Sequence, residues 1–199
     1  DTILLTEPKR RSVVKDNNKV ILKGEEIREL IFEMAEKIVS RYGKDADRLA
    51  LVGIRTGGVF LMERIHRILK KKLKTDIPKG IVDITLYRDD IDSSLSKPEV
   101  GETELLFDVN DKYIILIDDV LFTGRTIRAA IDVIIDFGRP KKIEVAVLVD
   151  RGHREIPVYA EFVGFKIETR ENDRVNVIFS EEGKRKEDAV ILEKGERKL

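Results

Sequence analysis

Residues 114–126, with the sequence IILIDDVLFTGRT, decide how this chain folds and what it can bind. Ile114 to Ile117 are typical of a buried β-strand. Asp118 and Asp119 follow directly, and a Thr-Gly-Arg-Thr turn then opens a helix. Because unpaired buried carboxylates are costly, two at a strand end indicate a binding role, and backbone N–H groups at a helix start bind anions. The segment therefore predicts a sugar-phosphate pocket, with the phosphate on the turn and hydroxyls or a metal on the carboxylates.

Strand and helix patterns alternate around this segment. Helical spacing of apolar residues predicts helices over 24–42, 59–72 and 125–137. Apolar runs predict strands over 49–54, 80–87, 114–117 and 143–149, with shorter β segments near 158–165, 174–179 and 189–193. This order predicts an α/β fold with an open, mainly parallel twisted sheet flanked by helices. Residues 1–19 are expected to form an N-terminal extension and residues 20–199 a single domain.

The segments that carry unusual polar residues all follow predicted strands. They are residues 55–58 (RTGG), 118–126 and 150–154, together with a long polar loop over residues 88–111. In a parallel α/β sheet, ligands bind beyond the carboxyl ends of the strands. A polar loop of this length often acts as a lid. The four segments are therefore expected to converge on one active site.

Composition excludes several classes of function. Lys and Arg total 38, as do Asp and Glu, so the net charge indicates neither a nucleic-acid nor a membrane partner. No apolar run reaches the roughly 20 residues that a membrane helix needs. The first residues lack the basic and apolar regions of a signal peptide. The absence of cysteine excludes disulfides and thiolate catalysis. A cytoplasmic protein is expected.

The central segment resembles the phosphoribosyl-diphosphate (PRPP) signature of type I phosphoribosyltransferases. Residues 83–90 (DITLYRDD), 120–126 (VLFTGRT) and 147–155 (VLVDRGHRE) are similar to the PyrR family, whose members are described as bifunctional pyrimidine-operon attenuation regulators and uracil phosphoribosyltransferases. The resemblance covers roughly residues 20–193. It implies the type I phosphoribosyltransferase fold with a small C-terminal β hood, Mg²⁺ as cofactor, and a homodimer or an assembly of dimers.

The resemblance also implies roles for individual residues. Asp118 and Asp119 would accept hydrogen bonds from the ribose hydroxyls and help to hold Mg²⁺, partly through PRPP and water. Arg88 would meet the diphosphate when the long loop closes, and it completes the predicted catalytic set. The predicted PRPP-binding residues are Arg55, Thr56, Asp118, Asp119, Val120, Leu121, Phe122, Thr123, Gly124, Arg125 and Thr126. Arg151 and Val175 are predicted to contact the base, with Phe162 and Val163 as alternative wall residues.

Phe122 bears on the identity of the base. Purine phosphoribosyltransferases that resemble this fold carry an aspartate at this position, which can share a proton with the purine ring. A phenyl ring neither donates nor accepts one. The residue therefore favours uracil over hypoxanthine or guanine, with UMP as product and uridine nucleotides such as UTP as ligands.

The family's second activity is binding of the leader mRNA of the pyrimidine operon, promoted by uridine nucleotides. Candidate phosphate contacts are Arg41, Arg139, Lys142 and Arg154, with Lys141 and the basic stretch 64–74 as further candidates. Phe32 and Glu36 in the first helix argue against this activity, since a glutamate facing a phosphate repels it.

Three hypotheses stay open from the sequence. The first is a uracil phosphoribosyltransferase that also regulates transcription. The second is an RNA-binding regulator that uses the PRPP pocket only as a nucleotide sensor, and the third is a purine salvage transferase. The presence of Arg55, Arg88 and both acids favours catalysis.

Overall fold

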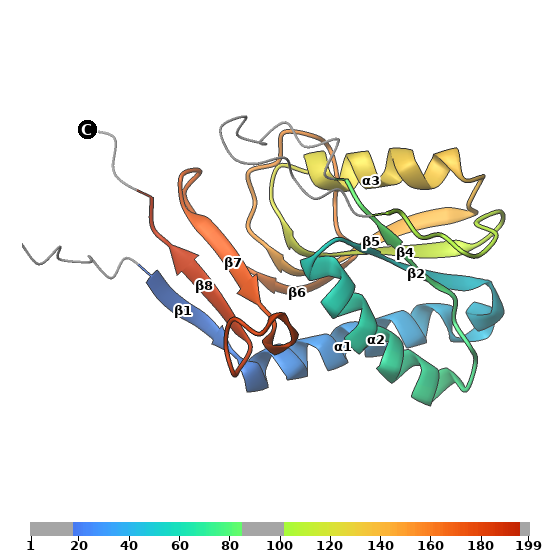
Figure 1. Ribbon diagram of the computed structural model, residues 1–199, viewed down its shortest axis with the longest axis horizontal. Coiled ribbons are helices and arrows are strands. Elements are labelled where there is room, and N and C mark those ends of the chain that lie inside the picture. Colours follow the sequence, from blue (N-terminus) through green and yellow to red (C-terminus); the bar gives the residue numbers. More distant parts are fainter. Residues whose placement is uncertain (1–17, 85–101, 196–199) are drawn as a thin grey trace, which may run out of the picture.

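The computed structural model describes residues 18–84 and 102–195, and its centre is a five-stranded sheet (Figure 1). The strand order is β3-β2-β4-β5-β6, and all neighbouring strands are parallel. The strands are β2 (Leu49–Ile54), β3 (Lys79–Val82), β4 (Tyr113–Leu121), β5 (Lys142–Asp150) and β6 (Phe162–Lys166). The predicted α/β fold with a mainly parallel sheet is confirmed.

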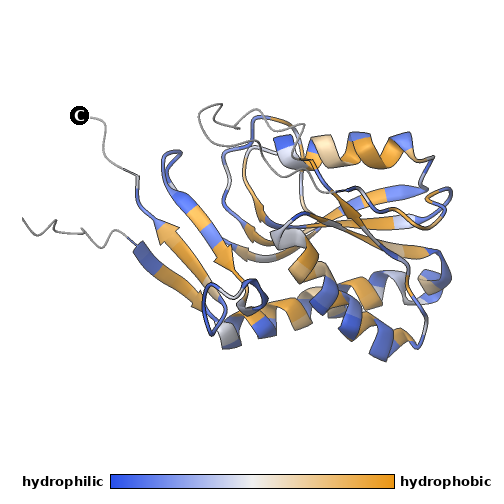
Figure 2. Ribbon diagram, in the orientation of Figure 1, coloured by the Kyte–Doolittle hydropathy of each residue, from blue (hydrophilic) through white to orange (hydrophobic). Residues whose placement is uncertain are grey.

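Helices cover both faces of this sheet. The helices α1 (Gly24–Tyr42) and α2 (Gly57–Leu73) pack on one face, and α3 (Arg125–Asp136) packs on the other (Figure 1). A short 3₁₀ helix, η1 (Gly43–Arg48), joins α1 to β2. Along β2, Leu49 and Leu51 point to the α1/α2 core, while Ala50 and Val52 point to the α3 core. Because both faces are buried, β2 is apolar along its length, and β4 and β5 contain long apolar runs (Figure 2).

A second sheet lies beside the carboxyl ends of the central strands (Figure 1). It is antiparallel in the order β1-β8-β7 and consists of β1 (Asn18–Lys23), β7 (Arg174–Ile178) and β8 (Ala189–Glu193). We call it the hood sheet. The strand β1 was not predicted, and it includes the last two residues of the predicted 1–19 extension. The division into an extension and one domain stays a prediction, because residues 1–17 lie outside the described part.

The hood sheet is held to α2 by an ion-pair cluster around Arg64. The Arg64 guanidinium donates to both carboxylate oxygens of Asp188, at 2.5 and 2.9 Å, and to Glu181 in the 3₁₀ helix η3 (Ser180–Glu182). The same guanidinium lies 4.8 Å from the centre of the Phe179 ring. Arg64, which belonged to the basic stretch considered for RNA, therefore holds the hood in place.

Four predicted segments differ from the observed ones, and one of them is the β segment predicted near 158–165, which is observed over 162–166 as β6. The strand predicted at 114–117 runs from Tyr113 to Leu121. The two acids therefore lie within the strand, near its carboxyl end, rather than after it. The strand predicted at 80–87 is observed only over 79–82, with residues 85–87 outside the described part. The predicted polar loop 88–111 is not polar throughout: Glu104 bridges to Ile81, and Leu105 and Val109 are buried. Residues 104–107 cover β3, which is an edge strand and needs protection.

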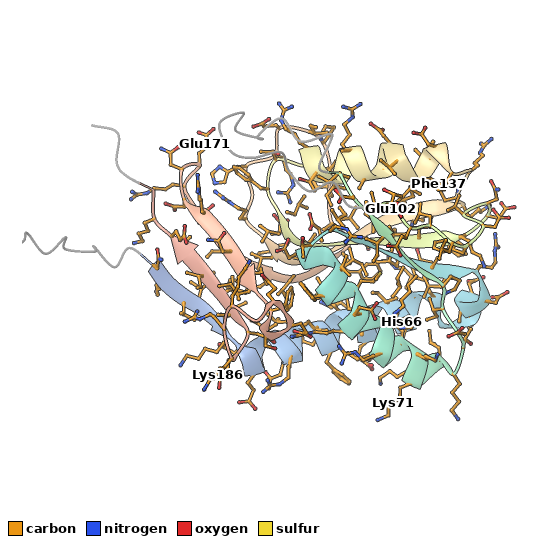
Figure 3. The ribbon with its side chains drawn as sticks, viewed as in Figure 1. His66, Lys71, Glu102, Phe137, Glu171 and Lys186 are labelled. Atoms are coloured by element: carbon orange, nitrogen blue, oxygen red, sulfur yellow. The ribbon has the colours of Figure 1, made fainter. Side chains whose placement is uncertain are left out.

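Side chains fill the space between the sheet and the helices on both faces (Figure 3). No helix within residues 18–84 and 102–195 has the length and apolar character required to cross a membrane.

Candidate active site

The loops after β4 and β5 meet the hood sheet around one cavity of about 660 Å³. The cavity is lined by Ile84, Val120, Leu121, Phe122, Thr123, Gly124, Arg125, Thr126, Ile127, Arg151, Glu155, Arg174, Val175 and Asn176. Seven predicted PRPP residues, Val120 to Thr126, and both predicted base contacts, Arg151 and Val175, are thus brought together. Asp118 and Asp119 directly precede this lining on β4.

The turn after β4 is shaped for an anion. Gly124 has φ +91°, a left-handed conformation that favours glycine, and it caps the start of α3. The Thr123 carbonyl accepts hydrogen bonds from the amides of Glu155 and Ile156 at 3.0 and 3.1 Å. The N–H groups of Thr123, Gly124 and Thr126 have no acceptor among the described residues. The turn is therefore anchored through its carbonyls and presents amides to the cavity.

The acidic end of β4 packs directly against the start of α2. A Cβ atom on Gly57 would lie 2.3 Å from Oδ2 of Asp119, and one on Gly58 would lie 2.3 Å from the carbonyl oxygen of Ile117. Only glycine fits at these positions, because real Cβ atoms do not approach that closely. The Arg-Thr-Gly-Gly loop after β2 is thereby brought beside the two acids, as the sequence predicted.

Each of the two acids accepts a hydrogen bond from the backbone of their own strand. Oδ1 of Asp118 accepts the Asp119 amide at 3.0 Å, and Oδ1 of Asp119 accepts the Val120 amide at 2.9 Å. Burial raises the pKa of Asp119, and its hydrogen bonds with the Asp118 carboxyl group and the Val120 amide oppose this rise only in part. The ionised form of Asp119 is therefore favoured by a cation or by hydroxyl donors that approach the site.

The residues present fit a magnesium ion that is shared with a substrate. The described residues include no group of three or more Asp, Glu, His or Cys side chains that could hold a metal ion alone. Mg²⁺ keeps several waters and is usually bound by one or two carboxylates together with substrate phosphates. Asp118 and Asp119 supply two such oxygen donors next to the anion-binding turn.

Arg55 lies at the mouth of the loop after β2. Its Nε atom is 3.6 Å from Oδ2 of the buried Asp83, and its Nη2 atom is 3.8 Å from Oε1 of Glu104. The peptide bond between Arg55 and Thr56 is cis. Arg55 is exposed, and Nη2 also donates to the carbonyl oxygen of Glu102 at 3.3 Å. Arg88, the third predicted catalytic residue, lies outside the described residues.

Arg151 and Phe122 lie together in the lining of the cavity. The guanidinium carbon of Arg151 lies 3.9 Å from the centre of the Phe122 ring, and Nη2 donates to the carbonyl oxygens of Arg170 and Glu171 at 3.1 and 3.3 Å. Glu171, labelled in Figure 3, lies in the turn that leads into β7. Burial lowers the pKa of Arg151, which Asp173 partly offsets. This arrangement presents an apolar ring and a fixed cation to a bound ring system.

The alternative wall residues Phe162 and Val163 do not line the cavity, and Phe162 is buried in the core. The lining also includes residues that the sequence reasoning missed, notably Arg174 and Asn176 on β7. The alternation of polar and apolar residues over 174–177 is the signal that could have identified them.

Three of the four predicted RNA contacts are engaged within the fold. Arg41 donates to Glu144 at 2.9 Å and to Glu161 at 2.5 Å, and Lys142 also pairs with Glu144. Arg154 pairs with Asp150 at 2.6 Å and donates to the Phe122 carbonyl at 2.7 Å. Arg154 therefore supports the anion-binding turn. These partners could not be read from the sequence, since most lie more than 30 residues away.

The remaining candidate RNA contacts, Arg139 and Lys141, differ from these because their side chains are free of such partners within the described part of the chain. The exposed side chains of Arg139 and Lys141 make no hydrogen bond or ion pair with any described residue. Glu36, which was expected to repel RNA, pairs with Lys72 at 2.6 Å. The same ammonium group lies 5.2 Å from the centre of the half-exposed Phe32 ring. The charge of Glu36 is therefore largely compensated, and the objection based on it is weakened.

The fold is shared with solved phosphoribosyltransferase structures. The hypoxanthine phosphoribosyltransferase of Trypanosoma cruzi has a TM-score of 0.65 at 17% identity, covering 89% of this chain and 97% of that one. A hypoxanthine phosphoribosyltransferase from Staphylococcus aureus has a TM-score of 0.57 at 22% identity, covering 80% and 84%. At these identities the likeness establishes the fold alone.

Sequence relatives establish the family. The phosphoribosyl transferase domain family matches residues 17–182. A protein named "Bifunctional protein PyrR" from Syntrophobacter fumaroxidans is 47% identical over 181 residues, which cover 91% of this chain and 96% of the relative. A protein of the same name from Ligilactobacillus salivarius is 52% identical over 168 residues, covering 83% and 90%. The chain therefore belongs to the phosphoribosyl transferase domain family and, within it, to the PyrR family.

Proposed function

We propose that the chain is a uracil phosphoribosyltransferase, which converts uracil and PRPP to UMP and diphosphate. The observation that carries this proposal is the cavity, whose lining combines the turn at residues 123–126, with its free amides, and the stacked pair of Phe122 and Arg151. Two carboxylates lie at its edge, where the ribose of a phosphoribosyl group would be held. The membership of the PyrR family supports the same activity.

The reaction requires positioning and charge stabilisation more than acid–base chemistry. The bond from ribose C1 to diphosphate breaks while uracil N1 bonds to C1, through a state with cationic character on the ribose, and the N1 proton passes to the departing diphosphate or to water. The amides of residues 123–126 would bind the 5′-phosphate of the ribose. Asp118 and Asp119 would accept hydrogen bonds from the ribose hydroxyls. Arg55 and Thr56 would bind the diphosphate, joined by Arg88. Fixing the partners in this way lowers the entropic part of the barrier.

Magnesium is the cofactor that we propose, with Asp118 and Asp119 holding it together with PRPP and water. When bound, Mg²⁺ would neutralise part of the charge on the leaving diphosphate. Phe122 favours uracil as the base, because its ring has no group that could share a proton with a purine.

We further propose that the protein regulates pyrimidine-operon transcription by binding leader mRNA when uridine nucleotides occupy the cavity. Arg139 and Lys141 are the exposed cations that support this second activity, since neither has a partner among the described residues. The alternative of a pure regulator is disfavoured by the complete set of predicted PRPP contacts. We place the protein in the cytoplasm, as a homodimer or an assembly of dimers.

The proposal is tested by assaying the chain with PRPP, Mg²⁺ and labelled uracil, hypoxanthine or guanine. UMP formation that depends on Mg²⁺ is expected, with little turnover of the purines. Turnover of a purine would contradict the choice of substrate. Failure with every base, together with UMP-enhanced binding of a leader hairpin in a gel-shift assay, would favour the regulator without catalysis.

Gly57→Ala is expected to lower kcat/KM for PRPP by about 10- to 100-fold, because the new methyl group would displace the Asp119 carboxylate. Steady-state kinetics with varied PRPP measures the loss. Gly43→Ala is the matched control, since Gly43 has φ −58° and its Cβ would meet only the Leu73 side chain at an ordinary 3.6 Å. Equal kinetics of the two variants would contradict the proposed packing of the acids on α2.

A further inference from the structure

The carbonyl groups of residues 121–123, at the end of β4 and in the turn after it, all accept hydrogen bonds from residues 151–156. Backbone amides of that segment donate to the first and the third of these carbonyls, at 3.0 to 3.1 Å. The middle carbonyl, on Phe122, instead accepts a hydrogen bond from Nη1 of Arg154 at 2.7 Å. The Arg154 side chain therefore completes the anchoring of this turn.

All three guanidinium nitrogens of Arg154 are engaged within the fold. Nη1 also donates to the carbonyl oxygens of Gly152 and Leu121, at 3.1 and 3.4 Å. Nε donates to the Val158 carbonyl at 3.0 Å, and Nη2 pairs with Oδ1 of Asp150 at 2.6 Å. The side chains of this ion pair are only 18% and 17% exposed. The guanidinium is thus committed to the protein's own acceptors, and its charge is compensated by Asp150.

A contact that fixes a carbonyl also fixes the N–H group of the same peptide unit. The peptide bonds of the turn are trans, and in a planar trans peptide the C=O and N–H groups point in opposite directions. Because the Phe122 carbonyl is directed at Arg154, the Thr123 N–H points away from Arg154. This N–H has no acceptor among the described residues, and Thr123 lines the cavity. Arg154 therefore sets the direction of an amide that is free to bind a ligand.

We propose that Arg154 is a positioning residue for the 5′-phosphate of the substrate. It holds the Phe122–Thr123 peptide unit so that the Thr123 N–H is aimed at the phosphate, and it does not touch the ligand itself. The inference rests on the proposed function, in which the amides of residues 123–126 bind this phosphate. An amide that is already in place needs no rearrangement when the anion binds, so losing its support weakens the contribution of the phosphate to affinity.

The test compares UMP with uridine, which differ only by the 5′-phosphate, in calorimetric titrations of the full chain. Arg154→Met removes every side-chain donor and is expected to weaken UMP binding about 10-fold. Uridine binding should change less than about twofold, because the groups that contact the base and the ribose are untouched. KM for PRPP should rise about as much as the affinity for UMP falls. The value of kcat should change little, since the 5′-phosphate contact is the same in the ground state and the transition state.

Further variants make the test specific. Arg154→Lys keeps the charge but has a single nitrogen, which cannot hold all the acceptors that the guanidinium holds, so it should recover only part of the preference for UMP. Arg128→Met is the same substitution in an exposed ion pair on α3, and it should leave the affinity for both ligands unchanged. If Arg154→Met fails to fold, its combination with Asp150→Asn takes its place, because that double variant leaves no unpaired carboxylate.

The outcomes separate the role of Arg154 from the proposed function. Equal weakening of UMP and uridine in Arg154→Met would indicate a general structural role. An unchanged preference for UMP would indicate no role, and full recovery by lysine would indicate attraction by charge. Each of these three results would overturn the inference about Arg154 alone. A wild-type chain that binds UMP no more tightly than uridine, or that forms no UMP from uracil and PRPP, would overturn the proposed function itself.

Discussion

Replacing Asp118 and Asp119 together with asparagine is expected to lower UMP formation by at least about 1000-fold. The amides keep the shape of the carboxylates but carry no charge. They therefore stabilise neither the cationic character that develops on the ribose nor a magnesium ion. The fold should be retained or slightly stabilised without ligand, because burial disfavours the ionised Asp119 carboxylate. Steady-state kinetics and thermal unfolding of the ligand-free protein measure the two effects.

Asp132→Asn is the control for this pair. Asp132 lies on the outer face of α3 in an exposed ion pair with Arg128 at 3.1 Å, away from the cavity lining. Its removal should leave both activity and stability nearly unchanged. If the double variant retained a tenth or more of the wild-type rate, the two acids would not have the role that we assign to them.

Arg64→Met is expected to lower the free energy of unfolding by about 3 kcal/mol, because it leaves the buried Asp188 carboxylate without its cation. The methionine still packs on Phe179, so the loss reports the charge rather than the volume. A less firmly held hood sheet should also raise KM for uracil, since β7 contributes residues to the lining of the cavity. Denaturant unfolding and uracil kinetics measure the two effects.

This destabilisation should depend on pH in a defined direction. Burial raises the pKa of Asp188, but hydrogen bonds from Arg64 and from the Ser180 amide outweigh it, so the net pKa is lowered. The Arg64 hydrogen bond also lowers the pKa of Glu181. A depressed carboxyl pKa contributes stability that is present above the unfolded value of about 4 and is lost as the pH falls through the folded value. The difference between wild type and Arg64→Met should therefore shrink below about pH 4.

Asp188→Leu combined with Arg64→Met distinguishes pairing from packing. The double variant buries no unpaired charge, so it should be more stable than Arg64→Met alone. Arg128→Met, on the exposed pair of α3, should have little effect at any pH. A loss of stability in Arg64→Met that stays the same from pH 7 to pH 3 would contradict the assigned ion pair.

Local patterns were sufficient to predict most of the central sheet. Its inner strands β2, β4 and β5 are buried on both faces and therefore contain long apolar runs, and its helices have clear apolar stripes. The weaker predictions concerned segments whose structure depends on distant partners. The strand β1 forms only by pairing with β8, near the other end of the chain, and residues 102–109 are ordered by covering β3.

The candidate site also has a part that is local in the sequence and a part that depends on distant residues. The anion-binding turn is a local motif, because Gly124 and the start of α3 lie within the same few residues. The part of the lining that comes from the hood sheet is not local: β7 reaches the cavity through its pairing with β8, and Arg64 holds the start of β8 to α2. Residues 114–126 alone could not predict this part of the lining.

The sequence by itself determined the fold class, the family, and the turn with two acids that we propose for the phosphate, because each depends on local patterns of residues along the chain. The tertiary structure alone decided which charged residues are already paired. Arg41 and Arg139 are both arginines, and the sequence alone gives no reason to treat them differently. In the structure, Arg41 pairs with Glu144 and Glu161, whereas the side chain of Arg139 is exposed and pairs with no carboxylate in the described part of the chain. The reason is physical: an ion pair depends on distance in space, and these partners lie 103 and 120 residues from Arg41 along the chain.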